Sequence, residues 1–415
     1  MIVEHYSVDQ GLPNNTVNCT LKDRDGFIWF GTWYGLCCFD GVKFKTFNKQ
    51  EHDSDVPPRK IQRIVEDKNG YIWVKTIDRK LYVFNKVTEC FHAVYDDMKN
   101  YSENIQVIKL QNTAEGDVLL LTKDKNLLLA GVDEKGQVTI KILFDSRNEI
   151  NKHDYTLKHH VLCETEEYIS WIGTDYKVSA VHKGAELASR PADFITSKIN
   201  SGDKDSFTSF FEDGRKVWVG DRAGIFYSID VRTGLVNRYV LSEIKGAISN
   251  LLVTPAGYVY LSVAGQGTYE YDLAERRLQK INTEMNDAMV THAFIDQYDK
   301  IWFHENEKAL IYYDPLNHTA KRFPFTMFGK ITTLYSEDAG ERGLFFLSPA
   351  GEAWLFDREH AEMVYINKLK QLSNDRANQQ FYHLMLDNDG VLWLSSADEG
   401  VYCMNFPKKQ FNLLS

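Results

Sequence analysis

The sequence of 415 residues lacks several features that identify common classes of protein. No stretch approaches 18 consecutive apolar residues, so the sequence predicts no membrane-spanning helix. The first residues have neither the basic region nor the apolar region of a signal peptide. The six cysteines include no CxxC pair and are too few for a disulfide scaffold in a chain of this size. We therefore expect them to be buried free thiols.

An excess of positive charge is also absent. The chain has 48 Lys and Arg residues against 58 Asp and Glu residues, which gives a net charge of −10. An acidic chain is a poor candidate for binding DNA or anionic lipid, so we expect no nucleic-acid partner and no direct membrane insertion. The content of 43% hydrophobic and 26% charged residues is that of an ordinary globular protein and excludes disorder and collagen-like folding.

The sequence motifs of common catalytic sites are missing as well. There is no nucleophile elbow GxSxG, no Walker A loop, no HExxH and no paired-cysteine motif. The string Gly265-Gln-Gly267 lacks the third glycine of a phosphate-binding loop and lies in a β repeat, so we interpret it as a turn. We expect no catalytic residues and no cofactor.

Two patterns that could bind a metal have simpler explanations. Asp23-Arg-Asp25-Gly26 resembles the start of a calcium loop, but an EF-hand requires Glu at the twelfth position, which here is Tyr34. The alternative is a hairpin turn. His159 and His160 are adjacent on an expected strand, so their side chains point to opposite faces. Neither pattern predicts a metal site.

What the sequence does contain is a repeat. The segment Asp23-Arg-Asp-Gly-Phe-Ile-Trp29 returns as Asp67-Lys-Asn-Gly-Tyr-Ile-Trp73, in each case before a second apolar run. Successive copies are separated by about 41 to 52 residues, close to the period of propeller blades. Nine copies are found, and the residues at the position of the first tryptophan are Trp29, Trp73, Leu119, Trp171, Trp218, Tyr260, Trp302, Phe345 and Trp393.

Each copy divides into four short strands. In the second copy, Ile61–Glu66 is an alternating strand, Asp67–Gly70 is a tight turn, and the segments that start at Tyr71 and Leu81 are the next two strands. In the first copy, the fourth strand is the Phe-rich segment 44–47. Asp stabilises the start of such a turn and Gly adopts its positive φ. Because one such sheet cannot bury both of its faces, we expect an all-β fold, a β-propeller of four-stranded antiparallel blades with the repeated aromatic between blades.

The sequence leaves the number of blades open. We assign residues 1–415 to one propeller with no separate second domain and favour a single ring of eight or nine blades. A ring of seven with two blades of a second propeller is the alternative, although unpaired blades would expose apolar faces and free edges. Ile2–Ser7 is suited to complete the last blade, and Gln410–Leu414 is suited to the same place. Ile366–Gln380 is the one candidate helix.

The first copy carries a family resemblance. Gly11-Leu-Pro-Asn-Asn15, followed by the segment from Val17 to Gly41, resembles the opening blade of the two-component regulator propeller family, and Leu392–Phe411 is similar to another of its blades. The resemblance implies the periplasmic sensor part of a hybrid two-component histidine kinase of Bacteroides-type bacteria, which acts in a phosphorelay. Such proteins also have an immunoglobulin-like domain, a membrane helix and a kinase core, and they can dimerise through those parts. The chain contains none of them, so we expect it not to be an enzyme.

The loops after the second strand of each copy are the expected ligand site. Trp33 and Tyr34 lie there, outside the repeated core positions. Aromatic faces stack on apolar C–H patches, and Arg and carboxylate groups bind hydroxyls, so this mixture suits an oligosaccharide or another small polar ligand. A set of solvated loops is the alternative. The predicted ligand-binding residues are Trp33, Tyr34, Arg79, Asp175, Tyr176, Arg222, Gln266 and His304, with Asp78, Asp221 and Glu305 at equivalent positions.

Three function classes remain open. The leading hypothesis is a carbohydrate-sensing module without catalysis, in which binding changes the arrangement of domains. The second is a propeller enzyme, a lyase or glycosidase, because streptogramin lyases are similar in their repeats. The third is a protein-interaction scaffold. An enzyme would require converging titratable groups in a closed pocket, whereas a sensor requires a binding surface and a downstream signalling element.

Overall fold

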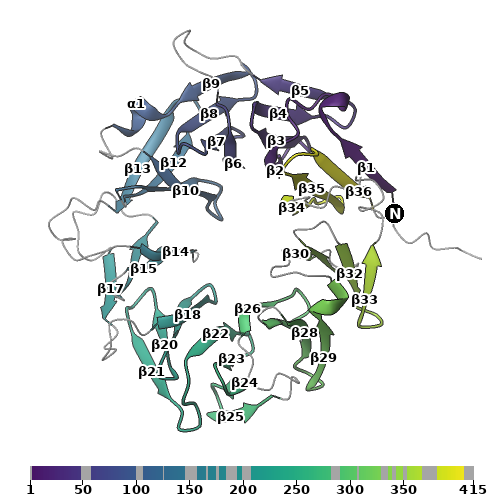
Figure 1. Cartoon of the computed structure of the whole chain (residues 1–415). Coiled ribbons are helices and arrows are strands. Elements are labelled where there is room, and N and C mark those ends of the chain that lie inside the picture. Colours follow the sequence, from purple (N-terminus) through teal and green to yellow (C-terminus); the bar gives the residue numbers. More distant parts are fainter. Residues whose placement is uncertain are drawn as a thin grey trace, which may run out of the picture. The chain divides into compact units, whose positions relative to one another are not determined.

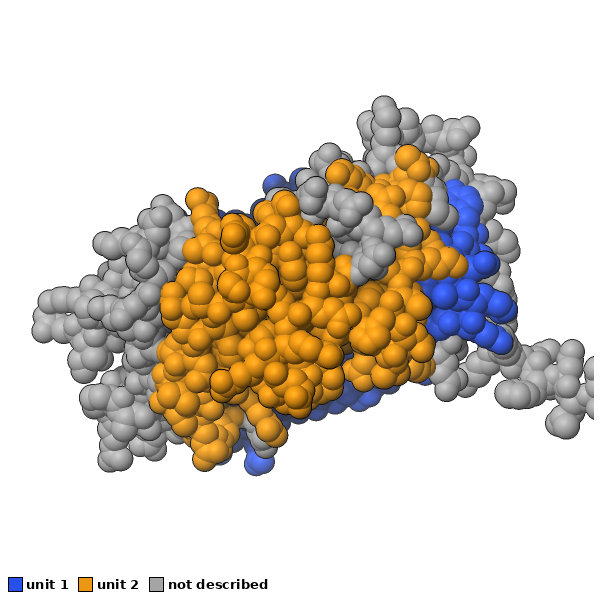
Figure 2. Space-filling view, turned by 90° about the horizontal axis from the view of Figure 1, so that it is seen from below, with its two compact units in different colours: residues 1–141, 333–415 blue, residues 142–332 orange. Residues whose placement is uncertain are grey.

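The computed structural model describes most of the chain. The described residues are 2–47, 58–99, 106–124, 126–144, 157–164, 167–173, 177–183, 194–198, 207–281, 290–305, 308–328, 335–338, 343–348, 353–366 and 381–405. The chain divides into two compact units, which are treated separately: unit 1 is Met1–Lys141 with Thr333–Ser415, and unit 2 is Ile142–Thr332 (Figure 2). None of the helices in the described residues has the length and apolar character needed to cross a membrane.

Unit 1 contains five four-stranded sheets within its described residues (Figure 1). A short helix, α1 (Tyr95–Met98), precedes the first strand of the third sheet. The last strand of that sheet, β13 (Val138–Phe144), crosses into unit 2 at Ile142. The sheets are β2 (Val17–Lys22), β3 (Ile28–Thr32), β4 (Gly35–Phe39) and β5 (Phe44–Phe47); β6 (Ile61–Glu66), β7 (Ile72–Thr76), β8 (Leu81–Asn85) and β9 (Cys90–Ala93); β10 (Val107–Asn112), β11 (Val118–Thr122), β12 (Leu127–Val132) and β13 (Val138–Phe144); β30 (Tyr335–Asp338), β31 (Leu344–Leu347), β32 (Ala353–Asp357) and β33 (Glu362–Ile366); and β34 (Phe381–Leu386), β35 (Val391–Ser396), β36 (Val401–Asn405) and β1 (Ile2–Tyr6).

Unit 2 contains four more four-stranded sheets in its described residues. A 3-10 turn, Phe325–Phe328, follows the last of them. The sheets are β14 (Leu157–Glu164), β15 (Tyr168–Gly173), β16 (Lys177–His182) and β17 (Phe194–Lys198); β18 (Phe207–Glu212), β19 (Lys216–Asp221), β20 (Ile225–Asp230) and β21 (Val236–Val240); β22 (Ile248–Val253), β23 (Tyr258–Val263), β24 (Gly267–Asp272) and β25 (Arg277–Lys280); and β26 (Val290–Ile295), β27 (Ile301–Glu305), β28 (Ala309–Asp314) and β29 (Thr319–Pro324).

These sheets confirm the predicted fold class, an all-β propeller of four-stranded antiparallel blades. In eight sheets the strands follow the order of the chain, and in the ninth the N-terminal strand β1 pairs antiparallel with β36, from Ile2 opposite Asn405 to Tyr6 opposite Val401. This is the pairing expected for the N-terminal segment. Gln410–Leu414, and all of the candidate helix except Ile366 at the end of β33, lie outside the described residues. The closure into one or two rings, and the assignment of residues 1–415 to one propeller, stay predictions.

The repeated Asp-to-Trp spacing has a direct structural cause. One carboxylate oxygen of Asp23, Oδ1, accepts hydrogen bonds from the backbone N–H groups of Asp25 (3.0 Å) and Phe27 (2.9 Å), which closes the turn between β2 and β3. The other oxygen, Oδ2, accepts a hydrogen bond from the indole Nε1 of Trp29 at 2.7 Å. In the repeats that have this pair, the aspartate therefore couples the turn to the core tryptophan. The same indole bond recurs in the pairs Asp67–Trp73 (2.9 Å), Asp213–Trp218 (2.7 Å), Asp296–Trp302 (3.2 Å) and Asp387–Trp393 (3.1 Å).

The repeated aromatic residues are buried, as predicted. Trp73 and Trp302 have no exposed surface, and Trp29, Trp218 and Trp393 are at most 4% exposed. Contacts across neighbouring sheets are seen in unit 1, where the ring of Trp29 lies 5.6 Å from that of Phe84 in the next sheet. The side chain of Trp171 lies outside the described set.

The described cysteines also match the prediction of buried free thiols. Cys19, Cys37, Cys38, Cys90 and Cys403 are free and buried. Burial raises the thiol pKa of Cys19, Cys37, Cys38 and Cys403 to about 12, so these thiols are protonated at neutral pH. The side chain of Cys163 is outside the described set.

Candidate functional site

The loops after the second strands of neighbouring sheets in unit 1 are joined by backbone hydrogen bonds. The N–H of Lys60, just before β6, donates to the carbonyl of Trp33 (2.9 Å), and the carbonyl of Lys60 accepts from the N–H of Ile77 (2.9 Å). In the next sheet the carbonyl of Arg79 accepts from the N–H of Val107 (3.0 Å). These loops therefore lie on one face of unit 1, and the chain before each first strand holds them there.

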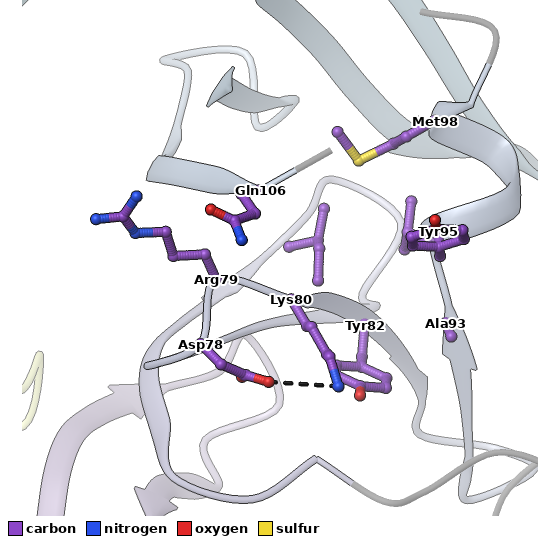
Figure 3. Close-up of a pocket in the computed structure, with 10 residues that line it drawn as sticks. Asp78, Arg79, Lys80, Tyr82, Ala93, Tyr95, Met98 and Gln106 are labelled. Carbon is purple, nitrogen blue, oxygen red and sulfur yellow. Dashed lines mark ion pairs between the residues drawn. The ribbon is translucent and has the colours of Figure 1, made fainter. Parts of the chain in front are cut away.

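A pocket of about 350 Å³ opens beside the loop between β7 and β8 (Figure 3). Its apolar part comprises Leu81 and Tyr82 of β8, Val94, and Met98 of α1, all of them buried. Its polar lining comprises Asp78, Arg79, Lys80 and Gln106, and the 55% exposed ring of Tyr95 lies at its edge. An apolar lining with a few polar groups is typical of a small-molecule site.

The charges of this pocket have different partners. Lys80 Nζ lies 3.3 Å from Asp78 Oδ2, and Thr76 Oγ1 also donates a hydrogen bond to Asp78. Burial by itself raises the pKa of Asp78, but the hydrogen bonds from Thr76 and Lys80 outweigh it and lower the pKa below its ordinary value. Asp78 is therefore an ionised hydrogen-bond acceptor. The guanidinium of Arg79 pairs with no carboxylate of the described residues.

Arg79 is held in place by its backbone. Its φ of 67° lies in the left-handed region, and its N–H donates to the carbonyl of Thr76 at 3.0 Å. Non-glycine residues adopt this conformation rarely, mostly where the surroundings impose it. The backbone of the loop is thus held without help from the arginine side chain. That side chain is exposed, so its guanidinium is accessible to a ligand.

Trp33 and Tyr34 are exposed on the loop between β3 and β4. Trp33 is 40% exposed and Tyr34 is 64% exposed, although both are large and partly apolar. The ammonium group of Lys60 lies 5.1 Å from the centre of the Trp33 ring, which is a cation–π contact. The ring is thus oriented by a neighbour, as a stacking surface for a ligand requires.

The predicted residues of unit 2 have different surroundings. Arg222 is exposed in the loop between β19 and β20, next to buried Asp221, whose carboxylate accepts hydrogen bonds from the N–H groups of Ala223 and Ile225. Gln266 accepts from the N–H of Lys245 at 2.7 Å and donates to the carbonyl of Glu243 at 3.1 Å. Its side-chain amide therefore already binds the chain between β21 and β22.

Three residues predicted in a loop lie on a strand instead. Asp221 is the last residue of β19. His304 and Glu305 are the last two residues of β27. Glu305 is buried and forms an ion pair with Arg322 at 2.9 Å, which is a structural role. His304 lies opposite His292 of β26, and burial, with a smaller effect of His292, lowers the pKa of its imidazole. The loop assignment was wrong because His304 and Glu305 follow Trp302 by two and three residues, as Gly31 and Thr32 follow Trp29, and these positions still belong to the second strand. Asp175 and Tyr176 lie outside the described residues.

Asp23 and Asp25, the carboxylates that resembled a calcium loop, share a lysine with Glu66. Asp23, Asp25 and Glu66 have oxygen atoms within 4.8 Å of one another. The ammonium group of Lys86 lies 3.0, 2.7 and 2.8 Å from these three carboxylates. Because Lys86 already supplies the positive charge, the cluster is a structural ion-pair network, in agreement with the hairpin-turn interpretation.

The sequence predicted one side of the pocket and missed the other. Arg79 and Asp78 were identified from their place after the second strand. Tyr95, Met98 and Gln106 belong to the longer connection between the second and third copies, which the repeat does not describe. The available signal was an aromatic residue and a methionine in a connection between repeats.

A comparison with family models identifies one segment. Residues 11–34 match the model of the two component regulator propeller family. The predicted resemblance is therefore confirmed for the first repeat, from the residues before β2 to the loop that carries Trp33 and Tyr34.

Curated proteins and solved structures give further similarities. An 84-residue segment is 33% identical to "Histidine kinase P4" of Formosa agariphila and covers 19% of this chain and 6% of that protein. The extracellular domain of the putative hybrid two component system BT4673 from B. thetaiotaomicron is 14% identical, with a TM-score of 0.41, and the match covers 96% of this chain and 66% of that one. An inactive virginiamycin B lyase from Staphylococcus aureus is 11% identical, with a TM-score of 0.45, over 72% of this chain and 94% of the lyase chain. The chain thus spans less than two thirds of the first two proteins.

Proposed function

We propose that this chain is the extracytoplasmic ligand-sensing module of a two-component system and that it binds an oligosaccharide at the loop face of unit 1. The family match at residues 11–34 and the 84-residue similarity to a histidine kinase support the signalling context. The main observation in favour of a binding site there is the pocket of about 350 Å³ beside the β7–β8 loop.

The chemistry of the pocket suits a sugar. The exposed ring of Tyr95 at the edge of the pocket offers a flat apolar face, and sugar C–H patches stack on such faces. Trp33, on the neighbouring loop, offers a second exposed ring outside the pocket. Asp78 and Arg79 supply an acceptor and a donor for hydroxyl groups. The apolar lining residues Leu81, Val94 and Met98 can contact the C–H surface of the same ligand.

The state of Asp78 favours binding over hydrolysis. A glycosidase requires a second carboxyl group, kept protonated by a raised pKa, to protonate the leaving group. Asp78 is the one carboxylate that lines the described pocket, and its pKa is lowered. In a sensor, the bound sugar would act by stabilising one arrangement of the domains over another.

Calorimetry with a panel of oligosaccharides tests this proposal. We expect Arg79→Asn, which removes the guanidinium but tolerates the left-handed backbone, to weaken binding of the glycan that binds best by about tenfold or more. Arg222→Asn removes the same charge from a loop of unit 2 and serves as the matched control. Binding that survives Arg79→Asn but not Arg222→Asn would place the site at the loop of Arg222, another of the ligand-binding residues predicted from the sequence. Release of products from the glycans would overturn the sensing role.

A further inference from the structure

One position of the repeat differs between the sheets in a way that the fold does not require. It is the residue two places after the core aromatic of the second strand, together with its partner on the first strand; we call these two residues the plus-two pair. In the first sheet the pair is Gly31 and Cys19, and in the β18–β21 sheet it is Gly220 and Ser209. In the second sheet it is Lys75 and Arg63. Two uncharged small residues are thus replaced by two cations.

The glycines at this position show how little room it has in these two sheets. A Cβ atom at Gly31 would lie 2.6 Å from Cγ2 of Ile61 and closer still to Sγ of Cys19. A Cβ atom at Gly220 would lie 2.5 Å from Oγ of Ser209 and 2.7 Å from Cγ2 of Ile248. The second sheet accommodates a complete lysine side chain at the same place. That lysine requires an explanation other than packing.

Lys75 is buried without a countercharge. It is 6% exposed, and its ammonium group donates one hydrogen bond, of 2.6 Å, to Oε1 of Gln62. Burial lowers the pKa of Lys75, and the charges of Arg79 and Arg63 lower it further. Lysine is rarely buried unless it is paired, and an unpaired buried cation destabilises the fold.

The nearby acids do not neutralise the three cations. Asp78 binds Thr76 and Lys80, and Glu66 binds Arg24 at 3.2 Å and Lys86 at 2.8 Å. Among the described residues, no carboxylate pairs with Arg63, Lys75 or Arg79. Arg63 and Arg79 are exposed, so an ion from solution can reach the group.

The neighbouring first strands add a further polar atom. β2 contacts both β6 and β34, and β34 carries His383, the plus-two partner of Ser395. Arg63 is close enough to His383 to help burial lower the pKa of this imidazole to about 4. Within the described residues, His383 Nδ1 is one of three buried side-chain atoms without a hydrogen-bond partner. A neutral imidazole beside the cations can donate a hydrogen bond to an anion.

We propose that Arg63, Lys75 and Arg79 form an oxyanion site, which takes the carboxylate, sulfate or phosphate group of a ligand. Arginine and lysine bind such groups through charge-assisted hydrogen bonds, and the anion would be the negatively charged partner that the ammonium group of Lys75 lacks. Arg79 is shared with the pocket beside the β7–β8 loop. If the proposed sugar-binding function holds, the ligand is therefore an acidic oligosaccharide rather than a neutral one.

The test compares acidic and neutral ligands in the same calorimeter at low ionic strength. The probes are oligogalacturonate, a sulfated oligosaccharide, a neutral oligosaccharide of equal length, and inorganic sulfate and phosphate. Lys75→Met and Arg63→Gln are each expected to weaken binding of the acidic probes by about tenfold or more. Lys43→Met, which removes an equal charge at an exposed position of unit 1, is the matched control.

The outcomes separate this proposal from the proposed function. If acidic probes bind and Lys75→Met and Arg63→Gln weaken them no more than Lys43→Met does, the oxyanion site is wrong, even if sugar binding stands. If sulfate or phosphate binds through these residues but no oligosaccharide binds, the oxyanion site holds and the sugar-sensing proposal fails. Arg63 is exposed, so Arg63→Gln tests the site even if Lys75→Met alters packing. Preference for the neutral oligosaccharide over its acidic counterpart would also overturn the proposal.

Discussion

The first two sheets of unit 1 have the same framework but different chemistry. In both, an aspartate closes the turn after the first strand and accepts the indole hydrogen bond of the core tryptophan, Trp29 or Trp73. In both, the loop after the second strand binds the chain before a first strand. They differ at the plus-two pair, Cys19 and Gly31 in the first sheet and Arg63 and Lys75 in the second. The repeated positions thus form a common framework, and the two sheets differ in charge at a position that this framework leaves variable.

The same distinction applies to buried polar atoms. The three side-chain atoms without hydrogen-bond partners in the described part of the chain belong to Ser209, His304 and His383, and all three residues are members of plus-two pairs. Native proteins leave few buried polar groups unsatisfied. Their concentration at one repeat position indicates that this layer of the sheets is under different constraints from the core beside it.

The largest expected effect on stability comes from removing the core tryptophan that the two sheets have in common. Trp73→Ala removes a fully buried indole and its bond to Asp67, and the free energy of unfolding should fall by about 3–5 kcal/mol. Trp29→Ala should cost a similar amount, and so should Trp218→Ala in unit 2. Urea denaturation followed by tryptophan fluorescence or circular dichroism measures the change. Tyr34→Ala, at a residue 64% exposed, is the control, expected within about 0.5 kcal/mol of the native chain.

A smaller effect is expected where the two sheets differ. Gly31→Ala places a methyl group against Cys19 and Ile61, so we expect a loss of about 1–3 kcal/mol from overpacking, and a similar loss for Gly220→Ala. Lys75→Ala, at the equivalent position, introduces no such clash and removes an unpaired buried charge. The denaturation midpoints of the three variants test the comparison. Equal destabilisation by Gly31→Ala and Lys75→Ala would show that the two sheets use this position in the same way.

Most of the fold could be predicted from the sequence because it depends on local chemistry that is repeated. The spacing from Asp23 to Trp29 specifies a turn and the strand that follows it, and copies of this spacing locate most of the sheets. The site was predicted less well. His304 was assigned to a loop, although its offset of two from Trp302 places it at a plus-two pair. The partners of Lys75 depend on strand register, and the pocket depends on α1, which lies between repeats.

The smallest expected effect has the opposite sign. Lys75→Met keeps the length and apolar stem of the side chain and removes a buried cation that has no acidic partner among the described residues. The variant should be more stable than the native chain by about 1 kcal/mol at neutral pH, because functional groups are often retained at a cost in stability. It should lose affinity for acidic probes at the same time. Loss of stability together with loss of binding would instead show that Lys75 supports the fold.

The difference in stability between the native chain and Lys75→Met should depend on pH. Burial and two arginines hold the pKa of Lys75 below its ordinary value. Between the folded and the unfolded pKa, the unfolded chain binds the proton more tightly than the folded chain. The destabilisation by Lys75 is therefore fully present below the folded pKa and decreases as the pH rises through it. Urea denaturation of the native chain and of Lys75→Met, at neutral and at alkaline pH, should show the gap between them closing. An unchanged gap would mean that Lys75 keeps its proton in the folded chain through the alkaline range, and that its charge has a partner.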